Sequence, residues 1–265
     1  MKSKFSVVIP AYNCEKVIKD ALDSVLSQTE LNLIGEVIVV NDGSKDNTKY
    51  VVEKYIEKHS DKLFIKLINK PNGGVSTARN VGVRESSYEW IAFLDADDEW
   101  YPDKIERQYK IISKLGEKNI DSLGGSFNGD VLNILGKKYS GLFKAKVSQI
   151  CLKNFPQPST AIIKKRVFDE LGGFDEAAHY AEDGLLFLQV CDRYNLYYDT
   201  RQVIEFGHGK RGFGVEGLSQ NVKAMHKGNI RNIKFLRKNK VISISFYIFL
   251  RIFYQLKYCR RILLS

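Results

Sequence analysis

The most informative segment of this 265-residue chain is Trp90-Ile91-Ala92-Phe93-Leu94-Asp95-Ala96-Asp97-Asp98. Its first five residues are apolar and predict a buried strand, and its last four place three carboxylates where that strand ends. Carboxylate oxygens held rigidly at a sheet edge suit a divalent cation that bridges a diphosphate. Acidic doublets also begin turns or cap helices, so the rest of the chain has to decide between the two interpretations.

The first hundred residues alternate between strand and helix patterns. Continuous apolar runs predict strands at residues 5–10, 36–40, 63–68 and 90–94. The segments between them predict helices at residues 17–26, 48–59 and 75–84. Strands without strict alternation, separated by helices, predict an α/β fold with a mostly parallel central sheet and helices on both faces. Ligands of such sheets bind beyond the carboxyl ends of the strands, so the turns that follow them should line one rim.

The positive charge of the chain is concentrated at its C-terminal end. The formal net charge is +10, yet residues 217–265 contain eleven Lys and Arg and no Asp or Glu, which leaves the first 216 residues close to neutral. A neutral body disfavours nucleic-acid binding. A basic tail that also contains apolar residues favours an anionic membrane surface as its partner.

Residues 241–256 are the most apolar part of this tail. As a helix they would extend about 24 Å, which is shorter than the roughly 30 Å hydrocarbon core of a bilayer. A polar stripe at i+4 spacing runs along this helix, formed by Ser243, Tyr247, Arg251 and Gln255. The pattern predicts an interfacial helix on a membrane. Two alternatives are a packed C-terminal helix that closes the core and a homodimer interface.

The cysteines and the N-terminus favour a cytoplasmic protein. Cys14, Cys151, Cys191 and Cys259 show no CxxC spacing and no disulfide density, so they are expected to be reduced thiols rather than zinc ligands. A predicted strand already begins at Phe5, so no secretory signal is expected at this end.

Five segments, in this order along the chain, resemble the signature of glycosyltransferase family 2. They are Val7-Val8-Ile9-Pro10-Ala11-Tyr12-Asn13, Val39-Val40-Asn41-Asp42-Gly43-Ser44-Lys45-Asp46-Asn47-Thr48, Asn72-Gly73-Gly74-Val75-Ser76-Thr77-Ala78-Arg79-Asn80, Phe93-Leu94-Asp95-Ala96-Asp97-Asp98, and Gly172-Gly173-Phe174-Asp175-Glu176 with Glu182-Asp183. Each segment alone has low specificity, whereas the ordered set is highly specific and covers about the first 200 residues. The resemblance implies an A-type, Rossmann-like glycosyltransferase fold, a divalent cation (Mn²⁺ or Mg²⁺), a UDP-sugar donor and inversion at the anomeric carbon.

The resemblance places the nucleotide-sugar site in the first half of the chain. The residues that match it are Pro10, Ala11, Tyr12, Asn13, Asp42, Asn72, Gly73, Arg79, Asp95 and Ala96. Asp42 would accept the imide N–H of uracil, Tyr12 offers a ring for stacking, and Arg79 would pair with the diphosphate or with the acidic cluster. The alternatives are a self-stabilising turn at Asp42, a simple rim aromatic at Tyr12 and an exposed helix arginine at Arg79.

The resemblance also implies metal and catalytic roles. Asp97 would be the principal metal ligand, Asp95 would assist through the ribose or the water shell of the metal, and Asp98 is expected to be a turn residue. His208 could complete the metal site, although a single His near glycines is often structural. Asp183 would be the general base and Glu182 would orient the base or the acceptor, whereas carboxylates in a first helical turn are also ordinary caps.

The sequence therefore predicts a catalytic domain at residues 1–216, with a nucleotide-binding half (1–100) and an acceptor half (101–216), followed by a basic, apolar helical segment at 217–265. Residues 119–149 are expected to form an irregular excursion on the acceptor side. The predicted enzyme transfers a hexose from a UDP-sugar to a lipid-linked saccharide in bacterial O-antigen or capsule synthesis, at the inner face of the cell membrane. The rival hypotheses are a sugar nucleotidyltransferase, which should carry a Gly-rich basic stretch where residues 10–13 stand, and a non-catalytic membrane- or nucleic-acid-binding module.

Overall fold

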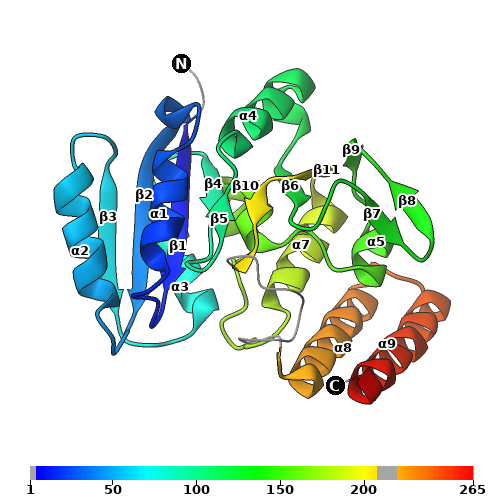
Figure 1. The fold of residues 1–265 in the computed structure, drawn as a ribbon. Coiled ribbons are helices and arrows are strands. Elements are labelled where there is room, and N and C mark those ends of the chain that lie inside the picture. Colours follow the sequence, from blue (N-terminus) through cyan, green and yellow to red (C-terminus); the bar gives the residue numbers. More distant parts are fainter. Residues whose placement is uncertain (1–3, 208–219, 265) are drawn as a thin grey trace.

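The computed structural model describes residues 4–207 and 220–264, and its central layer is a mixed, mostly parallel β-sheet (Figure 1). Among these residues, eight strands form the sheet in the order β3-β2-β1-β4-β10-β6-β11-β9. Their bounds are β1 Phe5–Ala11, β2 Ile34–Asp42, β3 Ile65–Lys70, β4 Trp90–Phe93, β6 Ser122–Ser126, β9 Leu142–Lys144, β10 Ile162–Lys164 and β11 Leu196–Gln202. The smaller strands are β5 Glu99–Trp100, β7 Leu132–Ile134, β8 Lys137–Tyr139 and β12 Ile204–Glu205. The predicted α/β fold is confirmed.

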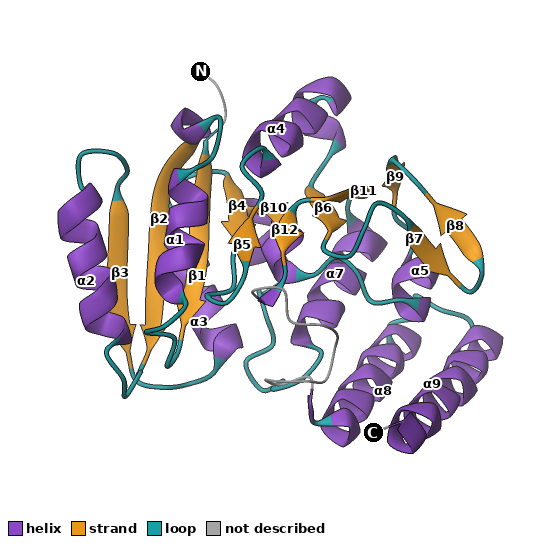
Figure 2. Cartoon of the chain, in the orientation of Figure 1, coloured by secondary structure: helices purple, strands orange, loops and turns teal. Residues whose placement is uncertain are grey.

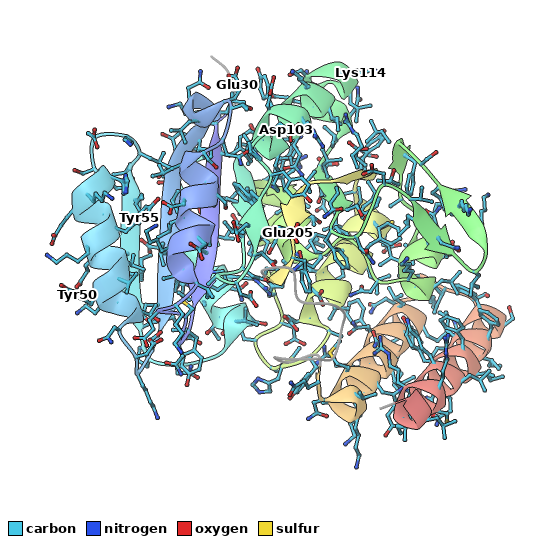
Figure 3. The ribbon with its side chains drawn as sticks, in the orientation of Figure 1. Glu30, Tyr50, Tyr55, Asp103, Lys114 and Glu205 are labelled. Carbon is cyan, nitrogen blue, oxygen red and sulfur yellow. The ribbon has the colours of Figure 1, made fainter. Side chains whose placement is uncertain are left out.

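Helices cover both faces of this sheet (Figure 2). Their bounds are α1 Ile18–Leu26, α2 Thr48–His59, α3 Val75–Arg84, α4 Lys104–Leu115, α5 Val147–Leu152, α6 Lys165–Glu170, α7 Glu182–Arg193, α8 Val222–Lys238 and α9 Ile244–Leu264. The first two helices are tied together by Tyr55 of α2, labelled in Figure 3, which donates a hydrogen bond of 2.8 Å to Asp23 of α1.

The apolar run of β2 explains why both faces of the sheet are covered. Val37 and Val39 belong to one core cluster, and Ile38 and Val40 point to the opposite face, where they pack with Ala78 of α3. Successive side chains alternate between faces, so a continuous apolar strand needs a helix layer on each side. α3 approaches the neighbouring strand β1 very closely, because a Cβ placed on Gly82 would lie 2.3 Å from a Val8 methyl group.

Parallel pairing brings the predicted rim together. β1 pairs in parallel with β2 and β4, and β2 pairs in parallel with β3. The register sets Ala11 beside Asn41, Asp42 beside Lys70, and Val8 beside Phe93. The turns that follow these strands therefore lie at one edge, as the sequence predicted.

The expectation of an irregular excursion at residues 119–149 is wrong in part. This segment supplies β6 and β9 to the central sheet, the β7–β8 hairpin and the start of α5. β6 has almost no apolar side chains of its own, because its sequence is Ser-Leu-Gly-Gly-Ser. Pro156 and Val203 pack directly onto the backbone at Gly124 and Gly125 and supply the apolar surface instead. The third strand is also displaced from its predicted position, since β3 begins two residues later and ends two residues later.

The C-terminal helices α8 and α9 lie side by side and pack on the rest of the fold (Figure 1). Ile233 and Leu236 of α8 and Leu250 and Tyr254 of α9 are buried in the same core cluster as Phe93 of β4. The packed-helix alternative therefore describes one face of α9. The predicted domain boundary at residue 216 lies outside the described residues.

A second face of α9 remains apolar and exposed. Ile244, Ile248, Ile252 and Leu256 follow at i+4 spacing and are all more than half exposed. We call these four residues the exposed apolar row. Within the described residues, none of the helices combines the length and apolarity that a membrane crossing needs.

Candidate functional site

The three carboxylates that follow β4 point in different directions. Asp97 is exposed and Asp95 is partly exposed, whereas Asp98 is buried. Asp98 accepts hydrogen bonds from the Ser159 hydroxyl (2.5 Å) and from the amide of Gly207 (2.9 Å). Burial, with a smaller contribution from Asp95, raises the pKa of Asp98 to about 7. Asp98 therefore has a structural role, because it links the segments of Ser159 and Gly207 below the rim. Asp95 and Asp97 are the carboxylates that face the rim.

Arg79 of α3 joins the donor side of the sheet to α7. Its Nη2 donates to Asp95 Oδ1 at 2.6 Å, and its Nη1 donates to Glu182 Oε1 at 3.3 Å. The guanidinium is only 4% exposed and lies 5.1 Å from the centre of the Phe174 ring. Burial by itself would lower the pKa of Arg79, but Asp95 and Glu182 raise it above its usual value. The predicted partners of Arg79 were the diphosphate and the acidic cluster, and in the structure Arg79 pairs with Asp95 of the acidic cluster.

Asp183 lies beside this ion-pair network, in the first turn of α7. Its Oδ1 accepts a hydrogen bond of 2.7 Å from the Gly184 amide, and its Oδ2 lies 3.5 Å from Asn154 Nδ2. Burial raises the pKa of Asp183 to about 7, and the neighbouring Glu182 carboxylate adds to this rise. A carboxylate with a pKa near neutrality is matched to proton abstraction at ordinary pH. Glu182 itself is buried and bonded to Arg79, so it positions α7 and does not face the solvent.

The backbone that leads into α7 is held by the C-terminal helices. Ala181 adopts a left-handed conformation (φ 56°), which costs free energy for a residue with a side chain. Asn232 of α8 is buried and donates a hydrogen bond of 2.7 Å to the Ala181 carbonyl. Gly228 allows this approach, because a Cβ there would lie 2.6 Å from the Tyr180 carbonyl oxygen. The basic tail is thus part of the scaffold of the site.

Asp42 organises the loop that follows β3. Its carboxylate accepts hydrogen bonds from the amides of Gly73 (3.0 Å) and Gly74 (2.8 Å) and forms an ion pair with Lys70. Asn72 Nδ2 donates to the Asp42 carbonyl at 2.9 Å. The predicted residues Asp42, Asn72 and Gly73 are therefore in one place, and Lys70 is a further charged residue there. Lys70 stands at the end of β3, so its position beside Asp42 follows only from the strand register.

The turns after β1 and β2 are also bonded to each other. The Asn13 amide donates to Ser44 Oγ at 3.0 Å, and the Lys45 amide donates to Asn13 Oδ1 at 2.8 Å. Asn13 has a left-handed backbone (φ 48°), a conformation that Asn tolerates well. Tyr12, next to it, is 48% exposed and presents its ring at this rim. Pro10 and Ala11 belong to buried β1 and set the position of this turn.

The predicted metal ligands fit a hard divalent cation through their chemistry. Within residues 4–207 and 220–264, no group of three or more His, Cys, Asp or Glu side chains forms a complete metal-binding cluster. Mg²⁺ and similar ions in nucleotide sites are often bound by one or two carboxylates together with substrate phosphates and water. Asp95 and Asp97, with Ala96 between them, provide this kind of donor set at the rim. His208, the third predicted metal ligand, lies outside the described residues.

Ligand sites of α/β folds lie beyond the carboxyl ends of the strands, where these carboxylates stand, and comparison with known proteins gives the family of the chain. The model of glycosyltransferase family 2 matches residues 6–172, and the chain belongs to this family. It is similar to an uncharacterized glycosyltransferase of Rickettsia typhi, with 32% identity over 212 residues, covering 76% of this chain and 62% of the relative. The chain thus spans less than two thirds of the length of that relative.

A relative with a printed activity and two solved structures extend the comparison. The Escherichia coli protein WfgD, a UDP-Glc:alpha-D-GlcNAc-diphosphoundecaprenol beta-1,3-glucosyltransferase, is 29% identical over 226 residues, covering 80% of this chain and 85% of WfgD. S. aureus TarS 1-349 in complex with UDP-GlcNAc is 25% identical, with a TM-score of 0.60 over 87% of this chain and 66% of that chain. The mannosyltransferase PcManGT from Pyrobaculum calidifontis, solved with GDP-Man and Mn²⁺, is 18% identical and shares the fold, with a TM-score of 0.67 over 90% of this chain and 65% of that chain.

Proposed function

We propose that this chain is an inverting glycosyltransferase that transfers a hexose from a UDP-sugar to a hydroxyl group of a polyprenyl-diphosphate-linked saccharide. The observation that carries the proposal is the Arg79 bridge, which joins Asp95 at the donor rim to Glu182, the residue next to Asp183. Asp183, whose pKa is raised, would thus stand across the site from the strand ends that are proposed to face the nucleotide. An inverting displacement needs one base placed opposite the leaving group.

The donor and acceptor classes are supported by the relatives. TarS has been solved with UDP-GlcNAc, and the name of WfgD states UDP-Glc as donor and a diphosphoundecaprenol-linked GlcNAc as acceptor. The donor of this chain is proposed to be UDP-glucose, UDP-galactose or an N-acetyl derivative. Its product would be a bacterial surface polysaccharide of the O-antigen or capsule type.

In the proposed reaction, the acceptor hydroxyl attacks the anomeric carbon from the face opposite UDP. The new C–O bond forms as the bond to UDP breaks, UDP leaves with the electron pair, and the hydroxyl proton passes to Asp183. Asn154, 3.5 Å from Asp183 Oδ2, orients this carboxylate, and the Arg79–Glu182 pair fixes the start of α7. Asp97 and Asp95 would hold Mn²⁺ or Mg²⁺, which neutralises charge on the departing diphosphate when bound.

The proposed location is the cytoplasmic face of the bacterial membrane, with the chain attached peripherally. α9 exposes the apolar row Ile244, Ile248, Ile252 and Leu256, and the preceding helix α8 carries Lys and Arg without any acidic residue. Apolar side chains beside clustered cations favour binding to an anionic membrane surface. Such attachment would keep the enzyme where a lipid-linked acceptor lies.

The test replaces the proposed base and measures transfer separately from nucleotide binding. Donor hydrolysis is first screened across UDP-sugars with Mn²⁺ and Mg²⁺ to select the donor. Asp183→Asn should then reduce transfer by about 10²–10⁴-fold while UDP affinity stays unchanged. The matched control is Asp192→Asn, which alters an exposed carboxylate at the other end of α7 and should leave turnover normal.

Three results would contradict the proposal. Near-normal turnover of Asp183→Asn on the natural acceptor would remove Asp183 from the role of base. Formation of a UDP-sugar from UTP and a sugar 1-phosphate, with release of pyrophosphate, would favour the nucleotidyltransferase. Absence of turnover with any UDP-sugar, combined with vesicle binding, would favour a non-catalytic module.

A further inference from the structure

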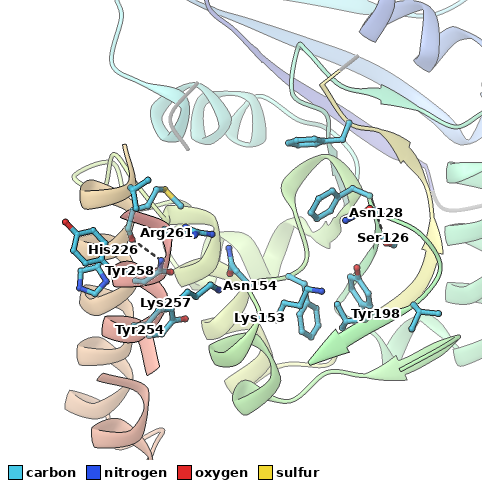
Figure 4. Close-up of a pocket in the computed structure, with 18 of the residues that line it drawn as sticks. Ser126, Asn128, Lys153, Asn154, Tyr198, His226, Tyr254, Lys257, Tyr258 and Arg261 are labelled. Carbon is cyan, nitrogen blue, oxygen red and sulfur yellow. Dashed lines mark hydrogen bonds between the residues drawn. The ribbon is translucent and has the colours of Figure 1, made fainter. Parts of the chain in front are cut away.

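A cavity of about 520 Å³ lies between the C-terminal helices and the acceptor half of the body (Figure 4). One wall is formed by α8 and α9, and the other by the ends of β6 and β11 and the segment that follows α5. Six aromatic side chains line it: Phe127, Phe155, Tyr198, Phe206, Tyr254 and Tyr258. Polar and charged side chains line the rest of it, among them Lys153, Asn154 and Lys257. A cavity of this size with aromatic walls is typical of small-ligand sites.

The face of α9 that lines this cavity changes its character along the helix. Leu250, Tyr254, Lys257 and Arg261 follow at spacings of four, three and four residues, so they share one face. The first two are buried against the body, and Tyr254 donates a hydrogen bond of 2.7 Å to the Cys151 carbonyl. Lys257 and Arg261 continue the same face into the cavity, where an apolar residue would ordinarily complete the packing.

Three cations meet in this cavity without an acidic partner. In Figure 4, Lys257 and Arg261 extend from α9 toward the segment that carries Lys153. Within the described part of the chain, no carboxylate forms an ion pair with any of the three. Burial lowers the pKa of Lys257, and the charges of Arg261 and Lys153 lower it further. Holding like charges close together costs free energy, and a bound anion would offset this cost.

Among the described residues that line the cavity, basic side chains outnumber acidic ones. Glu205 is the one acidic residue among the described residues that line the cavity, and it accepts a hydrogen bond of 3.3 Å from Tyr101. His226 also lines the cavity, where its ring stacks on Tyr258 at 4.5 Å, and burial lowers its pKa. The cationic side of the cavity therefore keeps its excess positive charge.

One residue that lines the cavity also contacts the candidate base. Asn154 lines the cavity and its Nδ2 lies 3.5 Å from Asp183 Oδ2. A ligand that fills the cavity would thus contact Asn154, the residue between the cavity and the carboxylate proposed to take the acceptor proton. A sugar phosphate matches this lining, because its C–H faces pack on aromatic rings and its phosphate pairs with Lys and Arg.

We propose that this cavity is the acceptor site and that Lys257, Arg261 and Lys153 bind the diphosphate that joins the acceptor sugar to its lipid. The inference rests on the proposed function for the identity of the acceptor. It assigns to the C-terminal helices a direct part in acceptor recognition, in addition to their packing on the body.

The test measures binding without any turnover, so it can succeed or fail independently of the proposed reaction. Hexyl diphosphate is titrated by calorimetry into the full-length protein at saturating UDP and Mn²⁺, which leaves the donor site filled. Wild-type protein should bind the probe, and Lys257→Gln and Arg261→Gln should each weaken binding by about tenfold or more. Lys114→Gln, at an exposed position of α4 outside the cavity, is the matched control and should change nothing.

A kinetic measurement then separates the diphosphate from the sugar. With an acceptor sugar on a short alkyl diphosphate, the two Gln variants should raise KM at least tenfold with little change in kcat. With the same sugar as a neutral alkyl glycoside, KM should be unchanged. Because neither Lys257 nor Arg261 forms an ion pair with a residue that the structure describes, both variants should keep the melting temperature of the wild type.

Several outcomes would overturn the inference. Wild-type protein that does not bind hexyl diphosphate, or variants that bind it as tightly as the wild type, would exclude the diphosphate site. If the same variants lose binding to phosphatidylglycerol vesicles but not to hexyl diphosphate, the cations serve a membrane headgroup and the proposal is wrong. A similar rise in KM for the neutral glycoside would show that the variants disturb the sugar site and not a phosphate contact.

Discussion

Asn232 of α8 donates a hydrogen bond of 2.7 Å to the carbonyl oxygen of Ala181, the left-handed residue immediately before Glu182 and Asp183. The donor comes from the basic tail, and the acceptor belongs to the turn that sets the direction of α7. This carbonyl also accepts a long hydrogen bond of 3.4 Å from the Leu185 amide of α7, so the contact from Asn232 is the shorter of its two hydrogen bonds. The tail is therefore expected to affect the chemistry through this contact.

Replacement of Asn232 by Ala should lower turnover more than donor binding. The Ala181 carbonyl would keep only the 3.4 Å hydrogen bond from the Leu185 amide, and loss of the Asn232 hydrogen bond costs about 0.5–1.5 kcal/mol of folding stability. The start of α7 would then be less well fixed, so kcat should fall while UDP affinity stays near that of the wild type. Asn239→Ala, which removes an exposed amide at the end of the same helix, is the control and should leave both quantities unchanged. Equal kcat values for the two variants would contradict the positioning role.

The rate of transfer should rise with pH through about 7. Burial and Glu182 raise the pKa of Asp183 to about 7, and Asp183 can accept a proton only in its ionised form. The kcat/KM for a sugar acceptor should therefore be low at pH 5.5, increase around neutrality and level off above it. Asp98 also has a pKa raised to about 7, so the profile needs a control. The residual activity of Asp183→Asn should be flat over this range, and a profile that keeps its rise in that variant would assign it to another group.

Replacement of Asp97 by Ala should abolish metal-dependent UDP binding while the protein stays folded. Asp97 is exposed at the end of β4, so its loss removes a ligand without opening the core. Calorimetric titration of UDP with and without Mn²⁺ measures the effect. Asp61→Ala is the matched control, because this exposed carboxylate precedes β3 at the opposite edge of the sheet. A UDP affinity that still depends on Mn²⁺ in Asp97→Ala would exclude Asp97 as the principal ligand.

The cations around the end of α8 should hold the protein on anionic vesicles. Each nearby Lys or Arg is attracted to such a surface by about 1 kcal/mol, and salt screens this attraction. The combined variant replaces Lys234, Arg237, Lys238 and Lys240 by Gln. In flotation with phosphatidylglycerol vesicles it should bind less than the wild type, with donor hydrolysis unchanged. Identical flotation of the two proteins would contradict electrostatic attachment.

The apolar row of α9 should contribute a part of membrane binding that salt does not remove. Ile248, Ile252 and Leu256 are exposed and make little contact with the body, so replacing them by Ser should leave the melting temperature unchanged. Flotation at high salt should fall in this variant, because burial of apolar side chains in the interface is insensitive to ionic strength. Replacement of the buried Leu250 by Ala is the control and should lower stability by about 2–5 kcal/mol.

The strands of the first half could be predicted from sequence because their local pattern and their tertiary environment agree. β1, β2 and β4 are apolar on both faces, and the structure covers both faces with helices. β6 could not be predicted, because its Gly-Gly pair is apolar only through Pro156 and Val203, which are distant in sequence. The pattern of α9 was ambiguous for a related reason, since one apolar helix here has both a buried face and an exposed face.

Site residues could be predicted where the residue type and its position in a motif indicate the chemistry. They could not be predicted where tertiary packing brings a residue to its partner in the site. Asp97 and Asp183 stand at element ends with their carboxylates, so motif and position indicate them directly. Lys70 lies beside Asp42 only because of strand register, and Asn154 reaches Asp183 only through the packing of α5 on α7. Asn232 gave no signal, since a single Asn in a basic helix has many possible roles.

Arg79 has a consequence for any attempt to recombine this enzyme with its relatives. The guanidinium comes from the first hundred residues, as does Asp95, but its second partner, Glu182, comes from the following part of the chain. A chimera that joins residues 1–100 to the second half of another transferase keeps a buried cation and needs a carboxylate waiting at the equivalent of Glu182. Without it, Arg79 would keep its ion pair with Asp95 but would lose its link to the helix that carries the candidate base. A chimera should therefore keep Arg79, Asp95 and the carboxylate at the position of Glu182 together.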